Sequence, residues 1–237
     1  MTSSLENRKR LGQVLTPKAV ARALVGWVIW RENDRLLDPS CGDGRFVACH
    51  RASVGVEVHK DAAAVARTRA PCALIHEAEF FAWASETHER FEAAAGNPPF
   101  IRYQHFNGVV RERALKAAAT LGARFNGLAS SWAPFLVVTA GLLKPGGRMA
   151  FVVPAEIGHA PYATPTLTAL CDHFDEVQVI AVQEKLFPEL SEDAWLLFAH
   201  GFGGHTNSIE LSVVERFVPI GQPPRRIKRV SLGAWRD

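Results

Sequence analysis

A short stretch of the sequence, Phe91 to Phe100 (FEAAAGNPPF), ends an apolar segment in an Asn followed by two prolines. Pro99 disfavours the helical conformation for Pro98, and neither proline has an N–H, so the carbonyls of this corner cannot fold back into a helix and are presented outward. The side-chain oxygen of Asn97 and the carbonyl of Pro98 are then two hydrogen-bond acceptors side by side. Such a pair suits a single NH2 group.

Two acceptors on one amine change its reactivity. The exocyclic amine of a base or of an amide is a poor nucleophile because its lone pair is delocalised. Hydrogen bonds from its two protons to Asn97 and Pro98 localise that lone pair, so the corner predicts electrostatic and positional catalysis of attack by an amine. The flat ring of Phe100 offers a face on which a planar acceptor can stack.

A glycine-rich turn, DPSCGDG, follows an earlier strand-like segment. Gly42 and Gly44 let the backbone approach a ligand closely. The turn lacks the Lys-Ser/Thr of a phosphate loop and the third glycine of a dinucleotide fingerprint, so a dehydrogenase is the weakest interpretation. Instead Asp38 ends the strand, where a carboxylate suits a cationic ammonium group. Cys41, inside the turn, is interpreted as a small filler.

Two further acids end the next two strand-like segments. Glu57 follows Gly44 by 13 residues and can accept both hydroxyls of a ribose, while Glu79 can face an adenine amine. Taken singly, Asp38 can be a cap, and the two glutamates solvated surface. Together at successive strand ends they indicate a nucleoside with an ammonium group and no phosphates, which describes S-adenosylmethionine. The corner and this cofactor predict an in-line methyl transfer.

The elements that must position these residues alternate along the chain. Strands separated by helices of about 10–15 residues predict a doubly wound α/β fold with a mostly parallel sheet, expected to have seven strands, and ligands bind beyond the carboxyl ends of such strands. Thr16 and Pro17 are expected to cap and open a first helix. Strands are predicted at 35–40, 53–58, 72–80, 91–97, 148–154, 176–183 and 194–200, and helices at 18–30, 44–52, 60–70, 109–121, 133–143 and 164–174.

The composition is that of an ordinary globular protein. A chain of 237 residues with 48% hydrophobic and 22% charged content can form one full core and a small appendage. We expect residues 1–200 to form a cofactor-binding catalytic domain with an N-terminal helical segment. Residues 201–237 are expected to form a short extension with β and basic character after a glycine joint at 201–205. One interpretation of this extension is the start of an absent target-recognition domain.

Charge, cysteines and hydropathy exclude little and add few sites. The net charge of +3 is too small to prove a nucleic-acid partner, although basic clusters occur at 8–10 and 225–229. The four cysteines form no C-x-x-C pair and no metal spacing with the histidines, so we predict reduced thiols and no metal. The absence of a signal-like or membrane-spanning segment predicts a cytoplasmic protein with no membrane partner.

The motifs together resemble a known family. In chain order they are GQVLTP (12–17), DPSCGDGRF (38–46), GVE (55–57), EFF (79–81), GNPPFIRYQ (96–104) and LLKPGGRMAFVVPAE (142–156). This set resembles the DNA adenine-N6 methyltransferases of restriction-modification systems, most of all their gamma class, in which the segment beside the methionine precedes the glycine loop. The resemblance covers residues 10 to 200 and implies a class I S-adenosylmethionine-dependent methyltransferase with a Rossmann-like sheet.

Carried over by position, the resemblance implies roles for individual residues. Asn97, Pro98 and Phe100 would hold the target amine and base, and Phe187 would be a second aromatic against that base, or alternatively a core residue. Relatives more often carry Asp at the position of Glu79. The residues implied around S-adenosylmethionine are Thr16, Pro17, Asp38, Ser40, Gly42, Gly44, Phe46, Glu57 and Glu79.

An adenine in duplex DNA hides its amine in a base pair, so this activity requires flipping the nucleotide into a pocket. Tyr103 is expected beside the flipped base, with Arg102 and Gln104 on the extruded strand. Arg225 and Arg226 are expected to contact DNA phosphates or to solubilise a tail.

The resemblance leaves alternatives open. The 37 residues after His200 are too few for a separate target-recognition domain, so the chain is a catalytic part of something larger, works with a recognition subunit, or acts on something other than duplex DNA. The same corner chemistry serves methyltransferases of RNA bases and of protein glutamine. A catalytically idle S-adenosylmethionine-binding subunit is the alternative from another class.

Overall fold

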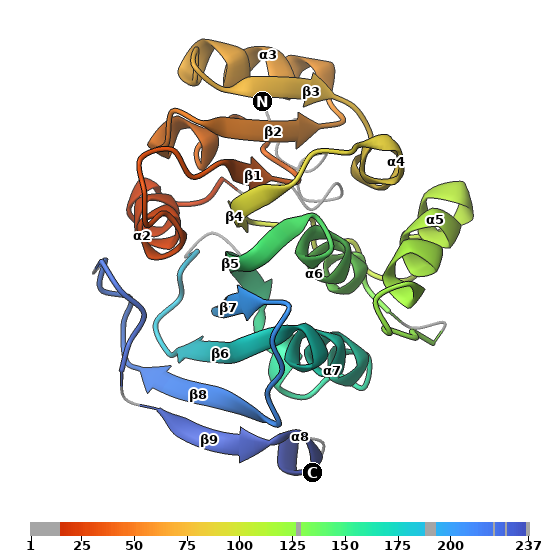
Figure 1. The fold of residues 1–237 in the computed structure, drawn as a ribbon, viewed down its shortest axis with the longest axis vertical. Helices are drawn as coiled ribbons and strands as arrows, with labels where there is room; N and C mark the ends of the chain where they lie inside the picture. Colours follow the sequence, from red (N-terminus) through yellow and green to blue (C-terminus); the bar gives the residue numbers. More distant parts are fainter. Residues whose placement is uncertain (1–14, 127–128, 188–192, 220, 226, 236–237) are drawn as a thin grey trace.

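The computed structural model describes residues 15–126, 129–187, 193–219, 221–225 and 227–235. In this part of the chain a single nine-stranded sheet has the order β3-β2-β1-β4-β5-β7-β6-β8-β9 (Figure 1). Strands β7 and β9 are antiparallel to their neighbours, and the other pairings are parallel. The strands are β1 (Leu36–Asp38), β2 (Ser53–Glu57), β3 (Leu74–Glu77), β4 (Phe91–Gly96), β5 (Leu143–Pro154), β6 (Phe174–Val182), β7 (Ala194–Phe202), β8 (Ser208–Val214) and β9 (Lys228–Ser231).

Helices cover both faces of the sheet, as expected for a doubly wound fold (Figure 1). The α-helices are α2 (Lys18–Val28), α3 (Lys60–Arg69), α4 (Phe80–Glu86), α5 (Gly108–Ala119), α6 (Trp132–Ala140), α7 (Ala163–His173) and α8 (Leu232–Trp235), with 3-10 turns η1 (Val47–Cys49) and η2 (Ala155–Gly158). Helices α2 and α3 lie on one side, and α4, α6 and α7 on the other, where α5 packs against α4 and α6.

The central strands are buried on both faces because successive side chains point to opposite sides. In β1, Leu36 packs in the core cluster under α2, and Leu37 in the cluster under α6 and α7. The same alternation occurs in β4, where Ala93 and Ala95 face α2 and Ala94 faces the opposite core. These small residues let the helices approach β4 closely.

The predicted doubly wound fold is confirmed, with two corrections to its strands. All seven predicted strands are present, but the sheet has nine, because β8 pairs in parallel with β6 and β9 pairs with β8. The described residues of the predicted extension at 201–237 therefore continue the same sheet.

Two predictions about helices, the helix at 44–52 and the cap at Thr16, are wrong, and one helix was not predicted. The segment 44–52 forms only the turn η1, because Gly44 adopts a φ of 86° and the chain straightens at His50. Helix α4 was not predicted; its start is capped by a Glu, which is not among the preferred capping residues. Also, Thr16 does not cap α2, which begins at Lys18 without a side-chain cap.

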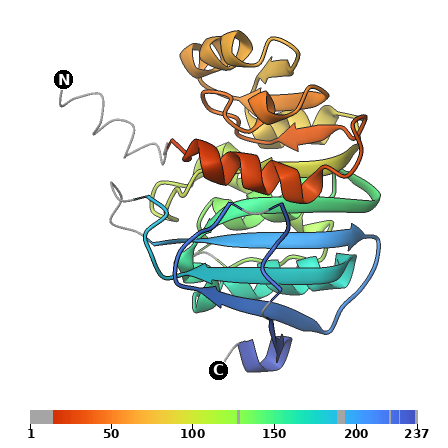
Figure 2. The ribbon, with the colours of Figure 1, turned by 90° about the vertical axis from the view of Figure 1, so that its left-hand side faces the viewer.

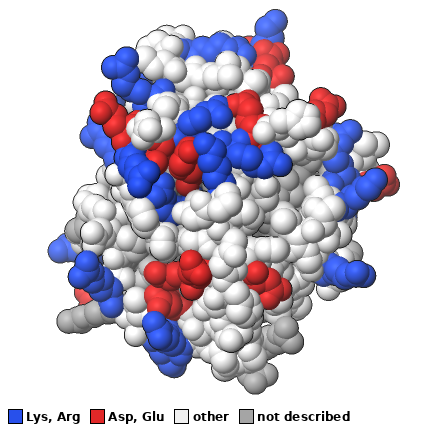
Figure 3. Space-filling view, in the orientation of Figure 1, with Lys and Arg blue, Asp and Glu red and all other residues white. Residues whose placement is uncertain are grey.

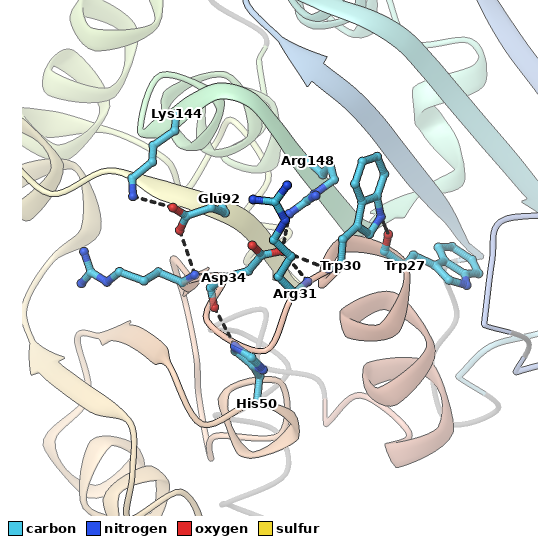
Figure 4. A network of polar contacts seen from close by, with 9 residues as sticks. Trp27, Trp30, Arg31, Asp34, His50, Glu92, Lys144 and Arg148 are labelled. Carbon is cyan, nitrogen blue, oxygen red and sulfur yellow. Dashed lines mark hydrogen bonds and ion pairs between the residues drawn. The ribbon is translucent and has the colours of Figure 1, made fainter.

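A buried ion pair fixes the end of the molecule where α2 ends and β1 begins (Figure 4). Arg148 on β5 donates to Asp34 at 2.6 Å, and both side chains are under a tenth exposed. Burial opposes ionisation of Asp34, but the backbone N–H groups of Trp30 and Arg31 and the Arg148 cation lower its pKa below the ordinary value. The guanidinium also lies 4.2 Å from the centre of the Trp30 ring. The pair joins the α2–β1 loop to the centre of the sheet.

The order of the strands reverses at β1, which lies between β2 and β4. In open α/β sheets, ligands bind outside the carboxyl ends of the strands at such a switch point. Figure 2 looks onto α2 and shows its first residues at the same edge as the arrowhead of β6, so α2 begins at the carboxyl edge of the parallel strands. The predicted site residues are expected at this edge.

Candidate active site

Asp38 ends β1 with a carboxylate that is almost fully enclosed. Its exposed fraction is 1%; Oδ1 accepts a hydrogen bond from the Ser40 N–H at 3.2 Å, and Oδ2 is buried without a hydrogen-bond partner. Burial, together with the charges of Glu57 and Asp43, raises the pKa of Asp38 to about 8. A buried acceptor with no partner costs free energy, so this oxygen is suited to a cationic donor from a ligand.

Glu57 ends β2 and is held by the backbone around it. Its Oε2 accepts from the Gly42 N–H at 2.9 Å and its Oε1 from the His59 N–H at 2.8 Å. Each oxygen retains a further lone pair, so a fixed carboxylate can still accept two hydroxyls. Val58, the next residue, is 56% exposed and places an apolar surface beside this acid. Val58 is not among the predicted site residues, although an apolar residue directly after a strand-end acid is visible in the sequence.

Glu79 has a structural task. Its two oxygens accept from the N–H groups of Phe81 and Ala82 at 2.8 Å and so cap α4, and Arg113 on α5 pairs with Oε2 at 3.2 Å. This arrangement explains the acid without a ligand. Contact of Glu79 with an adenine amine stays a prediction.

Two glycines of the site are required by close packing. Gly44 has a φ of 86°, and a Cβ there would lie 2.8 Å from the backbone of Ala66 on α3. Gly96 ends β4, where a Cβ would lie 2.8 Å from Asp38 Oδ1. The acid at the end of β1 therefore packs directly against the chain that leads into the Asn97 corner.

The corner after β4 contains two acceptors that have no hydrogen-bond donor among the described residues. Asn97 Nδ2 donates to Thr16 Oγ1 at 3.2 Å, while Asn97 Oδ1 is buried without a partner. No described residue donates a hydrogen bond to the Pro98 carbonyl. Asn97 Oδ1 and the Pro98 carbonyl are the two acceptors named in the predicted chemistry, and both are free of donors from the described residues.

Residues distant in sequence hold the corner in place. Ser131, at the start of α6, donates its hydroxyl to the Pro99 carbonyl and accepts from the Ile101 N–H at 3.0 Å. Ser40, in the glycine turn, donates to the Asn97 carbonyl at 3.3 Å and so links the two motifs. Ser131 is not among the predicted site residues, because a Ser before a helix signals a cap and gives no indication of a partner 32 residues away.

Of the three phenylalanines predicted at the site, one is half-buried and two are buried. Phe100 is half-buried and packs against both core clusters, so part of its ring remains accessible. Phe46 and Phe187 are 3% and 5% exposed and pack in the cluster under α2. This favours the interpretation of Phe187 as a core residue; contacts of Phe46 with a cofactor and of Phe187 with a base stay predictions.

The predicted nucleic-acid contacts are only partly brought together. Arg102, Tyr103 and Gln104 are exposed in the turn after the corner. Arg225 follows Pro224, whose carbonyl accepts a hydrogen bond from Gln178 on β6. Strand β6 is three places from β4 in the sheet order, so the two strands are roughly 14 Å apart. Arg226 lies outside the described residues.

The surface has two other features besides the switch-point edge, and the lining of the first contains none of the predicted site residues. A hollow of about 610 Å³ lies between α2 and η1, lined among others by Lys18, Arg22 and Cys49. Figure 3 shows the face where the parallel strands begin, and there Lys and Arg side chains are mixed with Asp and Glu. The switch-point edge is therefore the part of the fold where the predicted motifs converge. In the described residues there is no group of three or more side chains that could hold a metal ion, and no helix long and apolar enough to cross a membrane.

The fold is that of class I S-adenosylmethionine-dependent methyltransferases. A putative class I S-adenosylmethionine-dependent methyltransferase from Listeria monocytogenes superposes with a TM-score of 0.65 at 17% identity, over 86% of this chain and 66% of that chain. The modification subunit of a putative type I restriction enzyme from Vibrio vulnificus gives a TM-score of 0.67 at 18% identity, over 90% and 50% of the two chains. The DrdV–DNA complex gives 0.74 at 14% identity, over 97% and 31%.

The chain is similar in sequence to type II methyltransferases. It is 30% identical over 161 residues to M.TthHB8I of Thermus thermophilus, covering 62% of this chain and 35% of that protein. It is 26% identical over 202 residues to M.CvrRI of Paramecium bursaria Chlorella virus XZ-6E, covering 78% and 49%. No family model matches the chain. The chain therefore spans half or less of the length of these curated relatives.

These comparisons confirm two predictions from the sequence: the resemblance to methyltransferases of restriction-modification systems, and the class I methyltransferase fold. S-adenosylmethionine, the cofactor predicted from the acids at the strand ends, is the methyl donor of this class.

Proposed function

We propose that the chain transfers a methyl group from S-adenosylmethionine to the N6 amine of an adenine in DNA, as the catalytic part of a restriction-modification system. The observation that carries the proposal is the pair of unengaged acceptors, Asn97 Oδ1 and the Pro98 carbonyl, beside the unpartnered oxygen of Asp38. The pair of acceptors at Asn97 and Pro98 suits an amine with two protons, and the Asp38 oxygen suits an ammonium group.

The residues at the strand ends fit S-adenosylmethionine. Asp38 Oδ2 lacks a donor and would accept the ammonium group of the methionine part, while the two fixed oxygens of Glu57 would accept the ribose hydroxyls. Gly42 has a φ of 52° and open space where a Cβ would lie, so the turn leaves room for a ligand. Val58 would give the adenine ring an apolar contact.

The chemistry of the transfer is a single displacement. When bound, S-adenosylmethionine supplies a methyl group on a cationic sulfur: the N–C bond forms as the C–S bond breaks, the C–S electron pair remains on sulfur, and the amine loses one proton to solvent. The Asn97 side-chain oxygen and the Pro98 carbonyl would each accept a hydrogen bond from the amine, which localises the nitrogen lone pair and directs it. Phe100 stacks on the ring that carries the amine. Preorganised acceptors of this kind contribute mainly electrostatic and positional stabilisation.

The target adenine would leave the DNA stack to reach this corner. Flipping costs a few kcal/mol, which contacts to the backbone must offset. Arg102, Tyr103 and Gln104 are exposed directly beside the corner and are suited to the extruded strand. Because the chain spans only 35% and 49% of two relatives, we propose that recognition of the DNA sequence belongs to a separate domain or subunit.

The test is incorporation of labelled methyl from S-adenosylmethionine into unmethylated duplex DNA, transfer RNA and a protein extract. The wild-type chain should label DNA only, as N6-methyladenine. Asn97→Ala should lose transfer by about a hundredfold or more while binding S-adenosylmethionine normally in calorimetry. Label in RNA or on glutamine would show that the proposed substrate, adenine in DNA, is wrong. Absence of label from a chain that binds the cofactor, even when a recognition partner is supplied, would identify an idle subunit.

A further inference from the structure

Thr16 contacts the catalytic corner through its side chain, although it is 81 residues away in sequence. Its hydroxyl oxygen accepts from Asn97 Nδ2 at 3.2 Å, and Thr16 itself is only 4% exposed. A carboxamide has a donor on one side and an acceptor on the other, and the two orientations differ by a half-turn. The Thr16 contact occupies the donor side of Asn97 and leaves the acceptor side, Oδ1, without a partner.

The backbone of Thr16 is itself held in place. Arg45, in the glycine turn, donates from Nη1 to the Thr16 carbonyl at 2.8 Å. The same guanidinium pairs through Nε with Asp43 at 3.2 Å, and Asp43 also pairs with Arg69 on α3. Because Thr16 makes no cap hydrogen bond to α2, its hydroxyl is available for Asn97.

We propose that Thr16 is a positioning residue, held by Arg45, which fixes the Asn97 side chain through a hydrogen bond from its NH2 and so leaves the amide oxygen to meet the target amine. In the opposite orientation the NH2 of Asn97 would face the amine protons, and donor would oppose donor. This inference rests on the proposed function and adds a role for Thr16 different from contact with the methionine part of the cofactor.

The test compares Thr16→Val with Thr16→Ser in the methyl-transfer assay at saturating S-adenosylmethionine and DNA. Val keeps the branched shape and removes the acceptor; Ser keeps the acceptor. Loss of one neutral hydrogen bond predicts that Thr16→Val lowers kcat by about five- to tenfold. Thr16→Ser should stay within about twofold of the wild type, because it retains the hydrogen bond.

Two outcomes would overturn the proposal. An unchanged kcat for Thr16→Val with a raised KM for S-adenosylmethionine would make Thr16 a cofactor contact only. Equal losses of kcat for Thr16→Val and Thr16→Ser would show that keeping the hydroxyl does not preserve activity, and so would refute the hydrogen bond as the cause. Thermal unfolding of each variant checks that the protein is folded.

A second variant tests the proposal if Thr16→Val fails to fold. Arg45→Met removes the hydrogen bond to the Thr16 carbonyl without altering the corner itself. It should lower kcat by about two- to threefold while S-adenosylmethionine affinity is kept, and in a folded double variant it should add little to the loss from Thr16→Val. An unchanged kcat for Arg45→Met would refute the role of Arg45.

The failure of this proposal is distinguishable from failure of the proposed function. If the wild-type chain methylates RNA or glutamine, the proposed substrate is wrong, and the comparison of the Thr16 variants is made on that substrate. If the wild-type chain methylates adenine and Thr16→Val equals it in kcat, only the role of Thr16 is wrong. A chain that transfers no methyl to any substrate, even when a recognition partner is supplied, overturns both.

Discussion

The raised pKa of Asp38 predicts opposite effects of pH on the stability of the protein and on its affinity for S-adenosylmethionine. Burial and neighbouring acids raise this pKa to about 8 from an ordinary value of 3.8. Between these two pH values the folded protein retains a proton that the unfolded chain has released. The stability due to the protonated acid is therefore complete below about pH 4 and is lost as the pH rises through 8, by up to about 1.4 kcal/mol for each pH unit.

The perturbation is Asp38→Asn, a neutral side chain of the same shape. The free energy of unfolding of each cofactor-free protein is measured in urea at pH 5, 6.5 and 8. Between pH 5 and pH 8 the value for the wild type should fall, relative to the value for the variant, by roughly 4 kcal/mol at most. Groups shared by both proteins cancel in the difference. Parallel curves for the two proteins would refute the argument that Asp38 is buried and unpaired.

Binding should show the opposite dependence on pH. The Asp38 carboxylate must ionise to pair with an ammonium group, so the affinity of the wild-type protein for S-adenosylmethionine should increase up to tenfold per pH unit up to about pH 8. Calorimetry of Asp38→Asn should give weaker binding without this dependence. A wild-type affinity that is constant from pH 6 to 8 would mean that Asp38 does not meet the ammonium group.

Three further substitutions test other parts of the site and fold. Glu57→Gln should weaken S-adenosylmethionine binding by about tenfold or more in calorimetry, whereas the exposed neighbour Glu77→Gln should not; equal affinities would remove Glu57 from the site. Gly44→Ala forces an unfavourable backbone and a clash with α3, so urea denaturation should give a loss of about 2 kcal/mol or more, and wild-type stability would contradict the packing. Asp34→Ala leaves Arg148 buried without its partner and should cost about 3–5 kcal/mol in the same assay, while replacing both residues by Leu should recover most of it; a loss from Asp34→Ala below about 1 kcal/mol would show that the pair is dispensable.

Local chemistry explains what the sequence could predict. Strand ends are marked by Gly, Pro and acids, so the positions of Asp38, Glu57 and Asn97 at the carboxyl edge followed from the alternation of strands and helices. That the Pro98 carbonyl takes part in no backbone hydrogen bond with the described residues agrees with the two missing N–H groups of the corner. These features depend on a few adjacent residues and on the parallel sheet, which the sequence pattern specifies strongly.

Tertiary packing decides what the sequence could not predict. Whether Phe46 and Phe187 face a ligand or the core depends on how α2 covers the sheet, and both are buried there. Segment 44–52 has a helical composition, but the close approach of Gly44 to α3 leaves only a short turn. The partner of Asn97 is a residue 81 positions away, and no local pattern identifies it.

The buried polar atoms without partners give a physical reason to place the chemistry at this edge. The described part of the chain has five such side-chain atoms, and two of them, Asp38 Oδ2 and Asn97 Oδ1, belong to neighbouring motifs at the switch point. Each unsatisfied group costs about 1–3 kcal/mol, yet the surrounding hydrogen bonds hold both side chains in place. A fold tolerates such costs where a ligand supplies the missing partners. Here Asp38 Oδ2 suits an ammonium group, and Asn97 Oδ1 suits a neutral amine. These are the groups that a methyl donor and its acceptor would bring to the same corner.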